Sequence, residues 1–154
     1  MTGEPDLERL CADYNRRWNL GAFACGGVIV FYTGRIQILS VPRELVEPLQ
    51  RELTDRGVFA PCFDHVATGI RSYPVTSTLT DDGAHRLRME LLDRPHPRPR
   101  ITVSRNLVGL PSGSESKHWI VEPTGADSYP KLLTVLEIAD RVRTTIPGTG
   151  GSDG

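Results

Sequence analysis

Apolar residues recur at helical spacing in four stretches of the chain. In Pro5–Trp18 they fall on one face of a 3.6-residue period, at Leu7, Leu10, Cys11, Tyr14 and Trp18. Tyr129–Thr144 keeps the same period with Leu132, Val135, Leu136, Ala139 and Val142. Two further helices are predicted between these, one opening at Pro42 and the other over Thr80–Leu92.

The helix after Pro42 has clear signals at both of its ends. Its apolar stripe consists of Leu45, Val46, Leu49 and Leu53, and Gly57 is a suitable residue to end it. Pro48 falls in the second turn, so we expect a kink there or a later start. In the helix over Thr80–Leu92, Asp82 is the expected cap.

Short stretches rich in β-branched and aromatic residues predict the strands. Gly26–Thr33 and Arg35–Val41 meet at Thr33–Gly34, which predicts a β-hairpin with a tight turn. Both faces of the first strand are apolar, which predicts a central position in a sheet. Further strands are predicted at Val58–Phe63, Ile70–Ser77, Ile101–Ser104, Asn106–Leu110 and His118–Glu122.

The order of these elements predicts an α+β fold. Strands and helices alternate without a strict β-α-β period, so we expect a mixed, mostly antiparallel sheet with helices packed on its faces. Residues 5–146 should form a single α+β domain, and 147–154, rich in glycine, a flexible tail. The alternation of proline with arginine and histidine in Arg94–Arg100 predicts an extended connector.

Composition narrows the class of protein further. Of the 154 residues 38% are hydrophobic and 24% are charged, which is typical of a globular chain, and the net charge is −1. No apolar run approaches the ~20 residues of a membrane span, and the first residues do not resemble a secretory signal. We therefore expect a cytoplasmic protein without a membrane partner. The three cysteines contain no C-x-x-C pair, and we expect them to be small buried hydrophobes.

The familiar catalytic and metal-binding motifs are missing. Cys62 and His65 have the spacing of a ligand pair, but no second pair follows, so a buried thiol beside a surface histidine is the simpler interpretation. Ser112 and Ser114 lie in a Gly/Ser turn without the Gly-x-Ser-x-Gly spacing of a nucleophile elbow. Neither glycine-rich phosphate-binding motif occurs. No catalytic residue, metal site or cofactor is predicted.

One segment carries local positive charge. His85–Arg105 holds six arginines against Glu90 and Asp93, and Arg94, Arg98, Arg100 and Arg105 are the candidate contacts to nucleic-acid phosphates. The segment has no aromatic residues for base stacking. Codon usage in a GC-rich genome would also favour arginine, since Lys117 and Lys131 are the only lysines among 18 basic residues.

The second half of the chain resembles a known family. Arg100–Pro123 resembles the late part of primase–polymerase domains, in which a strand pair ending in Pro-Pro-Ser precedes a polar turn and an aromatic strand closing in Pro. Val108–Ser112 match the first piece, and His118, Trp119 and Pro123 match the second. Gly34–Leu53 and Tyr129–Arg143 are similar to the opening and the closing helix of small actinobacterial proteins labelled bifunctional primase/polymerase.

The catalytic residues of that family do not carry over. Polymerisation there uses two acids on one strand to hold divalent metal ions, whereas Ile36–Val41 offers only Gln37 and Ser40 as polar residues. The family's Gly-Gly-x-His motif is matched by Gly69–Ser72, with Ser72 in place of the histidine. The resemblance therefore implies a degenerate, non-catalytic module associated with nucleic acid or nucleotides. A regulatory protein that binds another protein, and a small-molecule enzyme whose site is scattered along the chain, are the alternatives.

Overall fold

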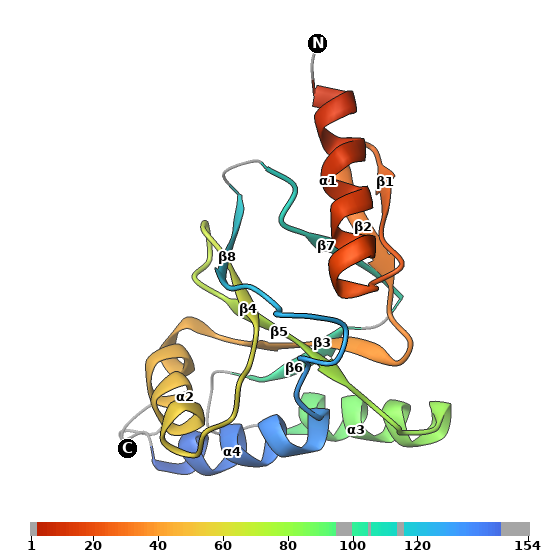
Figure 1. The fold of residues 1–154 in the computed structure, drawn as a ribbon. Helices are drawn as coiled ribbons and strands as arrows, with labels where there is room; N and C mark the ends of the chain where they lie inside the picture. Colours follow the sequence, from red (N-terminus) through yellow and green to blue (C-terminus); the bar gives the residue numbers. More distant parts are fainter. Residues whose placement is uncertain (1–2, 95–99, 105, 114–115, 146–154) are drawn as a thin grey trace.

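The strands of this protein form two separate antiparallel sheets. The structure, a computed structural model, describes residues 3–94, 100–104, 106–113 and 116–145, and these form four helices and eight strands (Figure 1). The small sheet has the order β1-β2-β7, and its strands are Phe23–Cys25, Val28–Tyr32 and Leu107–Leu110. The large sheet has the order β6-β3-β5-β4-β8, and its strands are Thr102–Ser104, Ile36–Val41, Arg71–Thr76, Cys62–His65 and Lys117–Val121. The expected α+β class is confirmed.

Three of the four helices cover one face of the large sheet. They are α2 (Arg43–Asp55), α3 (Asp81–Asp93) and α4 (Leu132–Thr145), and they lie below the sheet in Figure 1. The remaining helix, α1 (Gly3–Trp18), lies with the small sheet on the opposite side. Among the described residues, no helix combines the length and the apolar character that a membrane crossing requires.

Alternation along β3 divides the apolar residues into two cores. Leu39 and Val41 point towards the three helices, where they pack with Tyr73 and Val75 of β5. Ile36 and Ile38 point the other way, towards α1. Because successive side chains of a strand point to opposite faces, a strand that is apolar on both faces must be covered on both. The large sheet is covered in this way.

The second core is built around an aromatic cluster that joins α1 to the large sheet. The ring of Trp18 lies 5.2 Å from that of Trp119 on β8, which lies 5.3 Å from that of Phe63 on β4. The indole N–H of Trp119 donates to the Tyr14 hydroxyl, and that hydroxyl donates to the carbonyl of Pro111. The rings meet tilted or edge to face, the geometry that aromatic pairs prefer.

The predicted hairpin at Thr33–Gly34 is wrong. β2 and β3 belong to different sheets, and β2 instead pairs with β1, a three-residue strand that the sequence did not indicate. The tight turn lies at Gly26–Gly27, where φ is +61° and +86°. A two-residue hairpin turn of this kind needs positive φ at both central positions, which glycine adopts without steric cost. The prediction that β2 is central is confirmed within the small sheet.

The helix ends also differ from the sequence expectations. α2 begins at Arg43 with Pro42 as its N-cap and runs through Pro48, so the predicted later start is wrong. The carbonyl left without a donor by Pro48 belongs to Glu44, an exposed residue of the first turn. The cap of α3 is Thr80, not Asp82, because the Thr80 hydroxyl accepts from the N–H of Gly83 at 3.0 Å. Gly57, with φ +70°, follows α2 as predicted. The predicted connector falls mostly on residues 95–99 and the predicted tail on 147–154, which lie outside the described residues.

The positive φ angles of the Gly26–Gly27 turn predict the outcome of two glycine substitutions. Gly26→Ala or Gly27→Ala should each lower the free energy of unfolding by roughly 1 kcal/mol, because a β-carbon is disfavoured at positive φ. Gly34→Ala is the matched control, since Gly34 has neither a positive φ nor a close neighbour, and it should change stability by less than about 0.5 kcal/mol. Urea denaturation measures all three, and equal effects would contradict the turn assignment.

Candidate functional site

The chain passes between the two sheets three times, and the first two of these crossovers lie together. The first crossover, Thr33–Arg35, leads from β2 to β3, and the second, which includes Asn106, leads from β6 to β7. The N–H of Thr33 donates to the carbonyl of Asn106 at 2.7 Å and so joins the two crossovers. Asn106 has φ +71°, a left-handed conformation in which asparagine is one of the few tolerated side chains.

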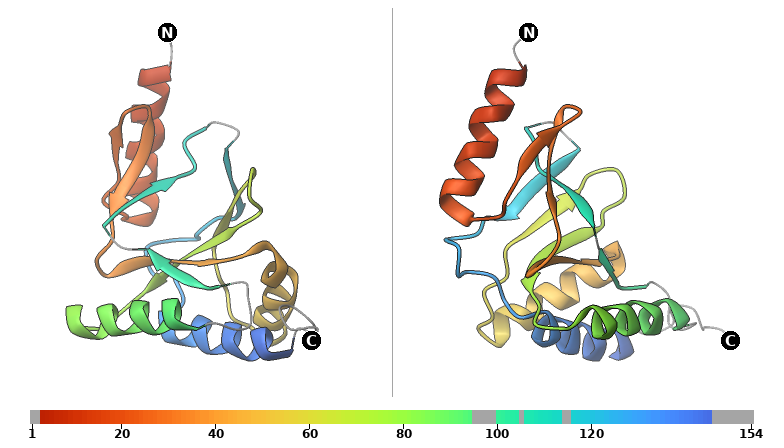
Figure 2. Two further views of the ribbon diagram at one scale, coloured as in Figure 1. Left: turned by 180° about the vertical axis from the view of Figure 1, so that it is seen from behind. Right: turned by 90° about the vertical axis from the view of Figure 1, so that its right-hand side faces the viewer.

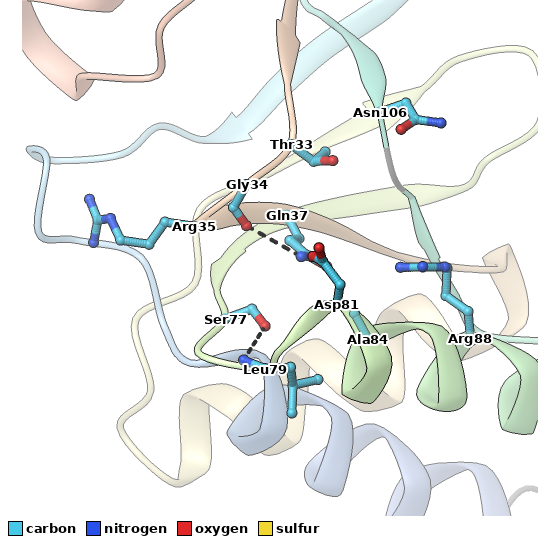
Figure 3. Close-up of a pocket in the computed structure, with 10 residues that line it drawn as sticks. All are labelled: Thr33, Gly34, Arg35, Gln37, Ser77, Leu79, Asp81, Ala84, Arg88 and Asn106. Atoms are coloured by element: carbon cyan, nitrogen blue, oxygen red, sulfur yellow. Dashed lines mark hydrogen bonds between the residues drawn. The ribbon is translucent and has the colours of Figure 1, made fainter.

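A polar pocket of about 360 Å³ opens beside these crossovers, and we call it the crossover pocket (Figure 3). Its wall combines the start of β3 and the segment after β5 with one side of α3. The polar side chains that line it are Thr33, Arg35, Gln37, Ser77, Asp81, Arg88 and Asn106. The volume lies within the range of small-molecule sites.

Gln37 supplies an unsatisfied hydrogen-bond acceptor in this pocket. Its side-chain N–H donates to the carbonyl of Gly34 at 3.3 Å, which fixes the direction of the amide (Figure 3). Its Oε1 is buried and has no hydrogen-bond partner among the described residues. A buried acceptor without a donor costs about 1–3 kcal/mol, so a ligand that brings an N–H or O–H to Gln37 gains that amount.

The charges around Gln37 have opposite signs and come from one helix. Asp81 lies in the first turn of α3 and Arg88 two turns later on the same helix, and both line the pocket with Gln37 (Figure 3). The guanidinium of Arg35 points away from them in the same view. The pocket thus presents a cation for an anionic group, a carboxylate for hydrogen-bond donors and a neutral amide.

Of the four arginines that the sequence analysis proposed as phosphate contacts, two do not line the crossover pocket and two lie outside the described residues. Arg94 bonds to both carboxylate oxygens of Asp140, at 2.6 and 3.4 Å, and so ties the end of α3 to α4. Arg100 is exposed just before β6. Arg98 and Arg105 are not among the described residues, although Arg105 is the chain neighbour of Asn106. Phosphate contacts by these four arginines stay a prediction.

The other sequence candidates are engaged in the fold. Cys62 is buried in the core beneath the helices, and burial raises the pKa of its thiol to about 11. Its predicted burial is confirmed, as is that of Cys11, whereas Cys25 is exposed. The Ser112 hydroxyl accepts from the N–H of Ile29 and donates to the carbonyl of Leu110, so it fixes a loop. Ser114 lies outside the described residues.

Among the described residues no three His, Cys, Asp or Glu side chains lie close enough together to hold a metal ion. Asp81 is the one carboxylate that the described part of the chain contributes to the lining of the crossover pocket. A metal held there would need further ligands from outside this set, since catalytic sites take at least three from the protein.

A chain of polar side chains on the large sheet was missed by the sequence analysis. Ser40 and Ser72 are cross-strand partners whose hydroxyl oxygens lie 2.9 Å apart, and Nε2 of His65 lies 3.2 Å from the Ser72 oxygen. Ser72 is only 1% exposed, so this serine–histidine contact is closed to a substrate. This row of hydrogen-bonded side chains satisfies buried polar groups between β3, β5 and β4. Only the strand register could have revealed it.

A second cavity of about 380 Å³ lies beside Trp119, but the protein's own side chains fill its binding positions. The Arg17 guanidinium lies 4.7 Å from the centre of the Trp18 ring and pairs with Asp13 and Glu122. The cation site on the aromatic face is therefore already occupied, and the crossover pocket is the stronger candidate.

The half-buried position of His65 predicts a pH dependence of stability. Burial, together with the nearby charge of Lys117, lowers the pKa of His65. The unfolded chain, with an ordinary histidine pKa near 6.5, therefore binds a proton more readily than the folded one, so the free energy of unfolding should fall as pH is lowered from about 7 to 5. His65→Gln should show a shallower fall in urea denaturation at these pH values, and identical slopes would contradict the assignment.

Searches against protein-family models, against curated proteins and against solved structures find no match to this chain. Its function must therefore be argued from its own residues.

Proposed function

We propose that this protein is a non-catalytic module that binds a nucleotide, free or as part of a nucleic acid, in the crossover pocket. The observation that carries the proposal is the buried, unpartnered Oε1 of Gln37 in one pocket with the guanidinium of Arg88 and the carboxylate of Asp81. This combination selects a ligand that is anionic at one end and rich in hydrogen-bond donors at the other.

A nucleotide has both an anionic group and several hydrogen-bond donors. Its phosphate oxygens accept from a guanidinium, which presents N–H donors in a rigid fork. Its sugar hydroxyls and base amino groups donate, and Gln37 and Asp81 offer the acceptors for them. Asn106 adds a side-chain amide that can pair with a base edge. Inorganic phosphate offers the arginine its oxygens but has neither sugar hydroxyls nor base amino groups for Gln37 and Asp81, so it should bind much more weakly.

We propose a non-catalytic module because the pocket has too few metal-binding groups to stabilise the transition state of phosphoryl transfer. That reaction depends on metal ions held by several oxygen ligands, and the described residues that line the pocket include a single carboxylate. The strand that would bear the metal-binding acids in primase–polymerase domains is β3. Its polar residues face apart, with Gln37 at the crossover pocket and Ser40 bonded to Ser72. The resemblance to primase–polymerase domains supports a nucleotide as the class of ligand, and the lining of the crossover pocket supports its place in the structure.

The test is a calorimetric titration of the full chain with three probes. These are adenosine 5′-monophosphate, inorganic phosphate and a short single-stranded oligonucleotide, each at two salt concentrations. We expect the mononucleotide to bind at least tenfold more tightly than phosphate, since one donor to a buried acceptor is worth about 1.4 kcal/mol or more. Tighter and strongly salt-dependent binding of the oligonucleotide would identify nucleic acid as the source of the nucleotide.

Matched variants locate the site. Gln37→Met keeps the side-chain volume and removes the acceptor, and Arg88→Met removes the cation, so both should weaken nucleotide binding about tenfold or more. Arg86→Met is the control, because Arg86 is exposed on the same helix and does not line the pocket. Circular dichroism verifies that each variant is folded. No nucleotide binding at millimolar concentration, or equal losses in Arg86→Met and Gln37→Met, would refute the proposal.

A further inference from the structure

Two charged side chains reach the crossover pocket from one face of α3. Asp81 lies in the first turn of the helix and Arg88 two turns later, and Ala84 between them also lines the pocket. Two turns bring the chain back to the same face after a rise of roughly 10 Å, so a carboxylate and a guanidinium are attached about that far apart along the helix axis. In both views of Figure 2, α3 (green) lies below the crossover from β2 to β3 (orange), where the pocket opens.

The carboxylate of Asp81 is not used by the fold. Thr80 caps α3, because its hydroxyl accepts from the N–H of Gly83, so the helix start does not need Asp81 for that purpose. Within the described part of the chain, the Asp81 carboxylate forms no hydrogen bond and no ion pair. An acid in the first turn also favours a helix through its dipole, but Asp82 has the same position and does not line the pocket. Both carboxylate oxygens of Asp81 are therefore available to a ligand.

A carboxylate with two available oxygens fits a group that has two adjacent N–H donors. Guanine has this pattern, since its N1–H lies beside its N2 amino group. Adenine and cytosine each place an amino group beside a ring nitrogen that is itself an acceptor, and a carboxylate repels its lone pair. Uracil and thymine place a single N–H between two carbonyls. Among the common bases, guanine is thus the one that can form two parallel hydrogen bonds to a carboxylate.

We propose that the crossover pocket selects guanine nucleotides, with Asp81 accepting from N1–H and N2–H of the base and Arg88 binding the phosphate. This inference rests on the proposed nucleotide-binding function and adds the base that the site prefers. The spacing of the two charges along α3 is comparable with the distance from the phosphate of a nucleoside monophosphate to the far edge of its base. Hydrogen bonds to an ionised acceptor are about twice as strong as neutral ones, so this pair of bonds decides between bases.

Gln37 has a different part in this arrangement. Its buried Oε1 is a single acceptor, and a sugar hydroxyl, which every nucleotide carries, satisfies it. Gln37 and Arg88 therefore contribute to the binding of any nucleotide, whereas Asp81 discriminates between bases. Because different residues carry the two roles, base preference and nucleotide binding can be tested separately.

Calorimetric titration of the full chain with nucleoside 5′-monophosphates tests the preference. We expect guanosine monophosphate to bind roughly tenfold or more tightly than adenosine monophosphate. Inosine monophosphate, which lacks the N2 amino group, should fall between them. Equal affinities for the guanosine and adenosine nucleotides would overturn the base preference and leave nucleotide binding in place. No binding of any nucleotide would overturn both.

Asp81→Asn gives a sharper readout than loss of binding. Asparagine presents one acceptor and one donor, which suit xanthine, because a C2 carbonyl there replaces the amino group of guanine. The variant should bind guanosine monophosphate about tenfold more weakly and should prefer xanthosine monophosphate to it. It should bind adenosine monophosphate at least as tightly as the unmodified chain does, since an asparagine amide can pair with an adenine edge.

Asp82→Asn is the matched control, because it removes the same charge from the same helical turn outside the pocket. It should keep the preference for guanine. Circular dichroism verifies that both variants are folded. A guanine preference that Asp81→Asn retains, or one that Asp82→Asn abolishes equally, would overturn the assignment of Asp81.

Discussion

The hydrogen bond between the N–H of Thr33 and the carbonyl of Asn106 joins two of the three places at which the chain passes between its sheets. These two crossovers meet at one corner of the small sheet, while the connection from β7 to β8 joins the sheets a third time and α1 packs against both. The crossover pocket lies at this corner, and its wall includes residues from both crossovers.

The aromatic cluster holds the two parts in register. Trp18 and Trp119 bring α1 against the large sheet, and the Tyr14 hydroxyl links the indole of Trp119 to the backbone at Pro111. A directional hydrogen bond within an apolar core specifies one arrangement of the packed elements, since a shift would leave a buried donor unpaired. The geometry of the crossovers, and of the pocket beside them, depends on this fixed placement of the small sheet.

Local patterns in the sequence predicted the elements, but pairing and the site depend on contacts distant along the chain. The four helices follow from apolar spacing, and all strands except β1 were expected. β1 was missed because its three residues, Phe-Ala-Cys, include no β-branched side chain, whereas the equally short β6 has two. The hairpin was misplaced because Thr33–Gly34 and Gly26–Gly27 look alike as turns, and only the backbone φ angles and the partners of β2 distinguish them. The pocket residues Gln37, Arg88 and Asn106 come from three separate segments and form no motif. The local excess of positive charge instead pointed to Arg94 as a phosphate contact, but in the structure Arg94 forms an ion pair with Asp140.

Amide chemical-shift mapping of the ¹⁵N-labelled full chain during titration with adenosine 5′-monophosphate tests the central claim most directly. If the ligand occupies the corner where the chain crosses between its sheets, the largest shifts will be those of Gly34, Gln37, Ser77 and Asn106. Shifts concentrated instead around Arg17 and Trp119, or spread evenly over the surface, would contradict the account.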